Sequence, residues 1–258
     1  MLFPAPRTII TITLPDDTLR PLNRDQTVKE QQELNSTRLL RLLNWVSPAL
    51  PIGSFAYSHG TEWAVENGDI RDAETLTLWV RDLLCHGSFR VDLAAVLTAW
   101  RAEDDDAARS AAAHTLAHAS SRERWEETLQ QGKAFIRAVE NWPAIDAPQT
   151  ETRRLSPPRQ CPLPVAFGLT CRQHGFDEHI TQLAYAHCAV SAVISACMRL
   201  IPLGQTESLR VLAALEGEIV RMIARMQNVS LDQVGSICFA SDLAAMLHET
   251  QKTRLFRT

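Results

Sequence analysis

The sequence of 258 residues predicts an all-α fold, a single-domain helical bundle of about ten helices with a mobile N-terminal arm. Two segments, which begin near Asp177 and near Leu209, repeat apolar residues at every third or fourth position, as one face of a helix does. The short connection at residues 201–204 predicts that these two helices pack antiparallel. Residues suited to capping a helix, such as Asp72, recur along the rest of the chain and support the same fold class.

The elements can be placed in chain order. Residues 1–34 hold a short alternating stretch and then a polar run without helical periodicity, so we expect a flexible arm there. Residues 35–258 form the predicted helical domain. Its first helix starts near Thr37 and ends near Pro48, because proline disfavours helical geometry in the residue before it. Residues 143–164 contain six of the thirteen prolines, a density that predicts a surface loop.

Composition limits the classes of function. The formal net charge of -4 argues against a protein that binds nucleic acid mainly through phosphate contacts. The six cysteines are widely spread and read as reduced thiols. No secretory signal is evident, and no unbroken run approaches the roughly 20 apolar residues of a membrane helix. We therefore expect a cytoplasmic protein that binds neither nucleic acid nor membrane.

One short motif imitates an enzyme. The sequence Ala56-Tyr-Ser-His-Gly60 matches the nucleophile elbow of serine hydrolases with its first glycine replaced. That elbow needs a strand before the serine, whereas a Pro/Gly loop precedes Ser58. Ser58 is better interpreted as a helix N-cap. Because phosphate-binding and dinucleotide-binding glycine motifs are also missing from the sequence, we assign no catalytic residue and no cofactor.

Histidines raise the alternative of a metal site. His114 and His118 lie one helical turn apart, and a second group comprises His174, His179, His187 and Cys188. The first pair has no third ligand nearby in the sequence, and His187 falls on the apolar face of its helix, where a core histidine is the usual case. We assign no metal ligand.

Two segments point instead to protein binding. Residues 45–62 mix aromatic side chains with turn-forming residues, as recognition loops often do. We expect Trp45 and Phe55 to pack onto the core and Tyr57 to face a partner. Residues 248–258 carry a charge of +2 and set apolar bulk between arginines, a composition suited to a docking tail that grips carboxylates. A frayed helix end is the alternative for this tail.

Four blocks, in order, resemble the urease accessory protein F family (UreF). They are the segment at residues 45–62, Val165-Ala-Phe-Gly168, the segment at residues 199–205, and His248-Glu249 together with Arg254-Leu-Phe256. The resemblance covers residues 39–258. One departure is Thr61, which stands where the family more often has leucine.

The resemblance implies an all-α homodimer without catalysis of its own. It implies that the protein works with UreD (also called UreH) and the GTPase UreG to deliver nickel to apo-urease, and that the tail becomes ordered when UreD binds. Nickel is then handled by the complex and is not a cofactor of this chain. The partner-binding residues carried over from the blocks are Tyr57, Ser58, Glu62, His248, Glu249, Arg254, Leu255 and Phe256.

Two other roles stay open within this assignment. The chain could be a nickel-binding carrier that holds the ion through histidines and cysteines. It could also be a GTPase-activating regulator of UreG, with Arg254 or another arginine acting as a finger.

Overall fold

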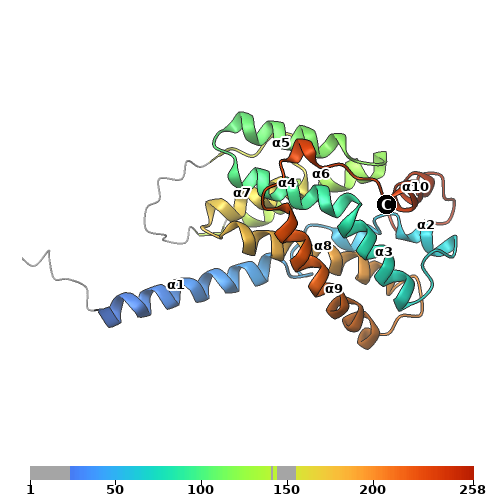
Figure 1. The fold of residues 1–258 in the computed structure, drawn as a ribbon, viewed down its shortest axis with the longest axis horizontal. Helices are drawn as coiled ribbons and strands as arrows, with labels where there is room; N and C mark the ends of the chain where they lie inside the picture. The colour runs from blue at the N-terminus through green and yellow to red at the C-terminus, as the bar shows by residue number, and fades with distance from the viewer. Residues whose placement is uncertain (1–23, 141, 144–154) are drawn as a thin grey trace, which may run out of the picture.

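The fold is all-helical, as expected. It comes from a computed structural model that describes residues 24–140, 142–143 and 155–258. Within these ranges the structure has ten α-helices, two 3-10 helices and no strand. Figure 1 shows their arrangement. The elements are α1 (Arg24–Trp45), η1 (Ser54–Ala56), α2 (Thr61–Glu66), α3 (Ala73–Cys85), α4 (Ser88–Arg101), α5 (Asp105–Ala117), α6 (Arg122–Val139), α7 (Leu163–Gln173), α8 (Glu178–Cys197), α9 (Gln205–Met226), η2 (Leu231–Gln233) and α10 (Phe239–His248).

Helix α4 lies at the centre of the bundle. It packs against α3, α5, α7, α8 and α9. Its middle section, residues 93–97, is an unbroken apolar run whose side chains are all buried. A helix that is apolar on every side must be surrounded by other helices, which explains the position of α4.

Glycine allows α7 to lie against its neighbours at very short range. A Cβ atom added at Gly168 of α7 would lie 2.4 Å from the carbonyl oxygen of Val96 in α4. A Cβ atom at Gly132 of α6 would lie 2.2 Å from the carbonyl oxygen of Cys161, just before α7. Both distances are far inside van der Waals contact, so backbones touch at these points and leave no room for a side chain.

The two helices predicted with the clearest periodicity are present. Asp177 caps α8, because its side chain accepts a hydrogen bond from the Ile180 backbone N–H at 2.8 Å. Helices α8 and α9 pack against each other, as expected from their short connection. Among the described helices, α8 alone has the length and apolar composition to cross a membrane, but half of that segment is buried inside the bundle. Its position is that of a core helix.

The first helix starts earlier than expected. Helix α1 begins at Arg24, whereas we predicted an arm that extends to residue 34. The polar residues 29–33 lack an apolar stripe, but Lys, Glu and Gln are good helix formers and continue the helix from its packed C-terminal part. Figure 1 shows this part of α1 projecting from the bundle. Residues 1–23 of the predicted arm lie outside the described residues.

The proline-rich loop is described only in part. Residues 155–162 have no helix, as predicted, and α7 starts at Leu163, one residue before the expected end of the loop. Residues 144–154 of the predicted loop lie outside the described ranges.

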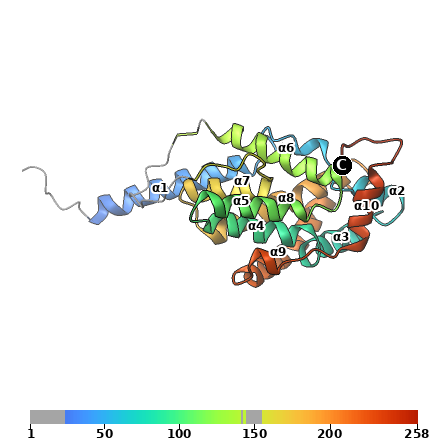
Figure 2. The same cartoon turned by 90° about the horizontal axis from the view of Figure 1, so that it is seen from above.

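Helices α2 and α10 form one end of the molecule. They pack against each other, and α10 also contacts α6. Figures 1 and 2 both place the C-terminus at this end, beside α2, α6 and α10. Residues distant in sequence, around positions 60, 125 and 250, therefore meet there.

Candidate partner-binding site

Residues 46–60, the motif loop, connect α1 to α2. Gly53 has φ +78°, a left-handed conformation that glycine adopts without strain, and the 3-10 helix η1 follows it. Trp45 is 1% exposed, within 6.1 Å of four other aromatic rings measured between centroids, so its predicted structural role is confirmed.

The expectation that Phe55 packs onto the core was wrong, whereas the partner role of Tyr57 stays a prediction. Phe55 is 72% exposed and does not plug the loop onto the core. Tyr57 is half-buried and lines a cavity beneath the loop. The chain leaves η1 in an extended conformation at Tyr57.

The motif loop reverses direction at His59 and Gly60. Both have positive φ, of 60° and 77°. At Gly60 an added Cβ atom would lie 3.0 Å from the backbone of Ala245 in α10, which explains the glycine by close approach as well as by conformation. Gly60, and not Ser58, is the N-cap of α2, so that prediction was wrong by two residues.

Ser58 is buried and bonded to the other end of the chain. Its hydroxyl donates to the carbonyl oxygen of Thr258, and its backbone N–H donates to the same oxygen at 2.7 Å. The backbone N–H of Arg257 donates to the Ala56 carbonyl at 2.9 Å. Residues 248–258, the tail, are thus joined to the motif loop by backbone hydrogen bonds.

Glu62 is the main acceptor for the tail. Its carboxylate is buried and accepts hydrogen bonds from the backbone N–H groups of Leu255 at 2.6 Å and of Phe256 at 2.9 Å. Hydrogen bonds to an ionised acceptor are stronger than those between neutral groups. Glu62 therefore holds the chain where it turns back across α2.

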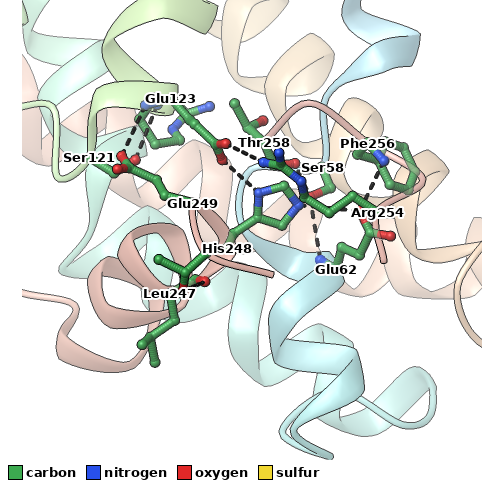
Figure 3. Close-up of polar contacts among 12 residues, drawn as sticks. Ser58, Glu62, Ser121, Glu123, Leu247, His248, Glu249, Arg254, Phe256 and Thr258 are labelled. Carbon is green, nitrogen blue, oxygen red and sulfur yellow. Dashed lines mark hydrogen bonds and ion pairs between the residues drawn. The ribbon is translucent and has the colours of Figure 1, made fainter. Parts of the chain in front are cut away.

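His248 joins Glu62 to a second carboxylate. Figure 3 shows its ring between Glu62 and Glu123, at 3.2 Å from Nε2 and 2.6 Å from Nδ1. The side chain is fully buried. Both ring nitrogens therefore lie within hydrogen-bond distance of a carboxylate oxygen. Arg254 also donates to Glu123, at 2.6 Å, so α2, α6 and the tail share one charge network.

Two further contacts connect the tail to α6. Glu249 Oε1 accepts from the backbone N–H groups of Arg122 and Glu123, at 2.7 Å and 3.3 Å, where unpaired N–H groups and the helix dipole favour an anion. The Thr258 hydroxyl donates to buried Glu127 at 2.7 Å, and Glu127 also pairs with Arg124.

The structure brings together the eight residues that the sequence assigned to partner binding. Leu255 is 63% exposed and Phe256 is 4% exposed, so only Phe256 belongs to the core. In this single chain the tail is already docked, whereas we expected it to order only when a partner binds. The acceptors that fix it, Glu62 and Glu123, belong to the chain itself and are available without a partner.

Sequence reasoning missed the contribution of α6. Its residues Glu123, Glu127 and Gln131 are four positions apart, in register with buried Phe135 and Val139, so they fall on the inner face of the helix. Polar residues that continue the buried face of an amphipathic helix were a usable signal, since such groups need partners from elsewhere in the fold.

His114 and His118 lie together, without a third possible metal ligand in the described residues. The rings of His114 and His118 stack at 4.8 Å between centroids, and His118 Nδ1 lies 2.9 Å from the His114 carbonyl oxygen. In the parts of the chain that the structure describes, no three His, Cys, Asp or Glu side chains are grouped as a metal ion would need. Burial raises the pKa of the thiols of Cys161 and Cys197 to about 12, so both stay protonated at neutral pH.

A cavity of 60 Å³ lies beneath the motif loop, and Asp92 of α4 lines it. The Tyr185 hydroxyl donates to Asp92 at 2.8 Å. Burial raises the pKa of Asp92 to about 6, although the charge of Arg124 and the Tyr185 hydrogen bond act in the opposite direction. Burial also holds the pKa of neighbouring His59 well below its usual range, and the positive charge of Arg124 adds to that effect.

Asp92 should make stability depend on pH. Between about pH 4 and about pH 6 the folded chain holds a proton on Asp92 that the unfolded chain releases. The free energy of unfolding therefore falls as the pH rises through this range. Asp92→Asn cannot titrate. Between about pH 4 and about pH 7.5, the free energy of unfolding of the variant should rise by roughly 3 kcal/mol relative to that of the wild type. Urea unfolding at both pH values measures this difference. A difference that is constant with pH would contradict the assignment.

The chain is similar over most of its length to known accessory proteins. A family model described as UreF matches residues 70–216, more than half of the 258 residues. Urease accessory protein UreF of Bradyrhizobium sp. is 44% identical over 232 residues, which cover 88% of this chain and 94% of the relative. The protein of that name from Rhodopseudomonas palustris is 45% identical over 233 residues (86% and 92%), and that from Agrobacterium fabrum 42% over 221 residues (85% and 96%). With the family model and these relatives in agreement, the chain belongs to the UreF family of urease accessory proteins.

Proposed function

We propose that this protein is a non-enzymatic scaffold that, with UreD, recruits the GTPase UreG for nickel insertion into apo-urease. The observation that carries the proposal is the junction of the motif loop and the tail through Glu62, which builds one surface from two ends of the chain. A role in the cytoplasm follows from the same proposal.

The exposed part of this surface has a composition suited to a protein partner. Phe55 and Leu255 are exposed apolar side chains, and Lys252, Arg254 and Arg257 are exposed cations. Arginine next to apolar bulk is typical of interface hot spots, and it pairs well with carboxylates on the partner. Arg254 is only partly used within the chain, since its side chain remains 38% exposed while it bonds Glu123.

A homodimer is part of the proposal. Helix α1 exposes Leu39, Leu40 and Leu43, each by more than half of its surface. Large apolar side chains gathered on one element mark a surface that another protein covers. A second copy of this chain fits that role.

Reconstitution of urease activation tests the scaffold role. Apo-urease, UreD, UreG, nickel and GTP are combined with the wild-type chain, without it, or with Arg254→Ala. We expect full activation only with the wild-type chain. Arg254→Ala should weaken the binding of UreG to the UreD complex about thirtyfold, as is typical of a hot-spot arginine. Lys252→Ala removes an exposed cation of the same tail and should change binding less than threefold or so.

Some outcomes would overturn the proposal. Full activation without this chain would exclude the scaffold. A carrier would be supported instead by two results together. The isolated chain would bind nickel stoichiometrically in equilibrium dialysis, and UreG would be recruited without this chain. A large rise in GTP turnover by UreG on addition of this chain alone would favour a GTPase activator.

A further inference from the structure

Arg199 lies between the two segments that form the proposed surface. Its guanidinium carbon is 3.7 Å from the centroid of the Phe55 ring and 4.1 Å from the centroid of the Phe256 ring. Its Nη2 atom donates to the Phe55 carbonyl oxygen at 2.8 Å. One planar cation therefore contacts the motif loop on one side and the tail on the other.

The position of Arg199 is fixed by the main bundle. It follows α8 (Glu178–Cys197) by two residues, and its backbone N–H donates to the Ala196 carbonyl at 3.0 Å. Burial lowers the pKa of Arg199, whereas the charge of Glu62 raises it, so the tail acceptor also lies within electrostatic reach. The core helix α8 thus carries the cation that both segments share.

Phe55 makes the arrangement unusual. Its ring is 72% exposed, so burial on the core does not hold it in place. The guanidinium stacks on that ring and simultaneously bonds its carbonyl oxygen. Stacking on a ring face is a property of the planar arginine head, and lysine reproduces it poorly.

We propose that Arg199 is a positioning residue that locks residues 54–57 to the tail, so that Phe55, Leu255 and Arg254 meet a protein partner as one surface. The role of that surface rests on the function proposed above, but the lock is a property of the single chain. The alternative is that Arg199 only supplies a positive charge at the C-terminal end of α8, where the helix dipole favours one.

Amide hydrogen exchange of the isolated full chain tests the lock. Three backbone N–H groups report on the tail, namely those of Leu255 and Phe256, bonded to Glu62, and that of Arg257, bonded to the Ala56 carbonyl. In Arg199→Ala we expect these amides to exchange about tenfold faster, while the amides of α4 keep their protection. Arg199→Lys keeps the charge, and its tail amides should exchange nearly as fast as those of Arg199→Ala.

Two further variants secure the result. Phe55→Ala removes only an exposed ring, so folding is not at risk, and it should also speed tail exchange by about threefold to tenfold. Arg210→Ala removes an exposed arginine of α9 and should leave the tail amides unchanged. Unchanged tail exchange in Arg199→Ala and Phe55→Ala would overturn the proposal, as would full protection in Arg199→Lys, which would assign a charge role.

Binding assays separate this inference from the proposed function. If Arg199→Ala frees the tail while the wild type fails to bind UreD and UreG, the lock stands and the scaffold role fails. If the wild type binds both partners and Arg199→Ala binds them equally well with a protected tail, the scaffold role stands and the lock fails.

Discussion

Glu62→Ala should lower the free energy of unfolding by about 3 kcal/mol and release the tail. The variant leaves the backbone N–H groups of Leu255 and Phe256 without their acceptor and removes one of the two carboxylates beside fully buried His248. Urea unfolding followed by tryptophan fluorescence measures the loss, and amide exchange at Leu255 and Phe256 shows whether the tail remains docked.

Glu66→Ala is the matched control. Glu66 lies one turn further along α2, is exposed, and accepts one hydrogen bond from Gln251 at 2.5 Å. Its loss should cost less than about 1 kcal/mol, because water replaces the contact. Glu62→Gln keeps the shape of the side chain and removes its charge. Its loss of unfolding free energy should lie between those of Glu62→Ala and Glu66→Ala. Equal losses in Glu62→Ala and Glu66→Ala would show that Glu62 does not hold the tail.

Deletion of residues 248–258 should leave the helical bundle folded, destabilise it by roughly 3 kcal/mol, and prevent formation of the complex with UreD and UreG. The deletion exposes the site of the Phe256 ring and strips Glu62 and Glu127 of their tail donors. A tail that becomes ordered only when UreD binds, as the resemblance implies, would not contribute to the stability of the isolated chain. The observed docking of the tail changes that expectation to a measurable loss of stability.

A pair of point variants separates stability from recognition. Phe256→Ala empties a buried site and should cost about 3 kcal/mol, whereas Leu255→Ala alters a side chain that is 63% exposed and should cost under about 1 kcal/mol. If Leu255 contacts a partner, Leu255→Ala weakens the complex without unfolding the tail. Undiminished co-purification of the truncated chain with both partners would contradict the assignment of the tail.

The bundle was predictable where regularly spaced apolar residues mark the buried face of a helix. Helices α8 and α9 follow from apolar periodicity, and Asp72 caps α3 as expected, with its side chain accepting from the Thr75 N–H at 2.8 Å. Helix α1 extends beyond the prediction because residues 24–34 continue a packed helix with good helix formers but no apolar stripe of their own.

The two chain segments of the candidate site could be picked out from the sequence, but the contribution of α6 and the geometry could not. The composition of residues 45–62 and 248–258 marked both segments. The outward position of Phe55 depends on Arg199, which is 144 residues away, and no local pattern encodes such a contact. Thr61 shows the same limit. It is fully buried where an apolar residue seemed natural, and its hydroxyl donates to the Ser58 carbonyl at 2.7 Å, a partner supplied by the turn before it.

The hydrogen bonds between Ser58 and Thr258 span 200 residues of sequence, which sets the order of events during synthesis. Contacts that close long loops carry a large entropic cost and form late, and a chain emerging from the ribosome folds from its N-terminal end. The bundle core can form while Glu62 and Glu127 still face water, and the surface closes only after residue 258 has emerged. A chain that lacks residues 248–258 would then fold its core without displaying that surface.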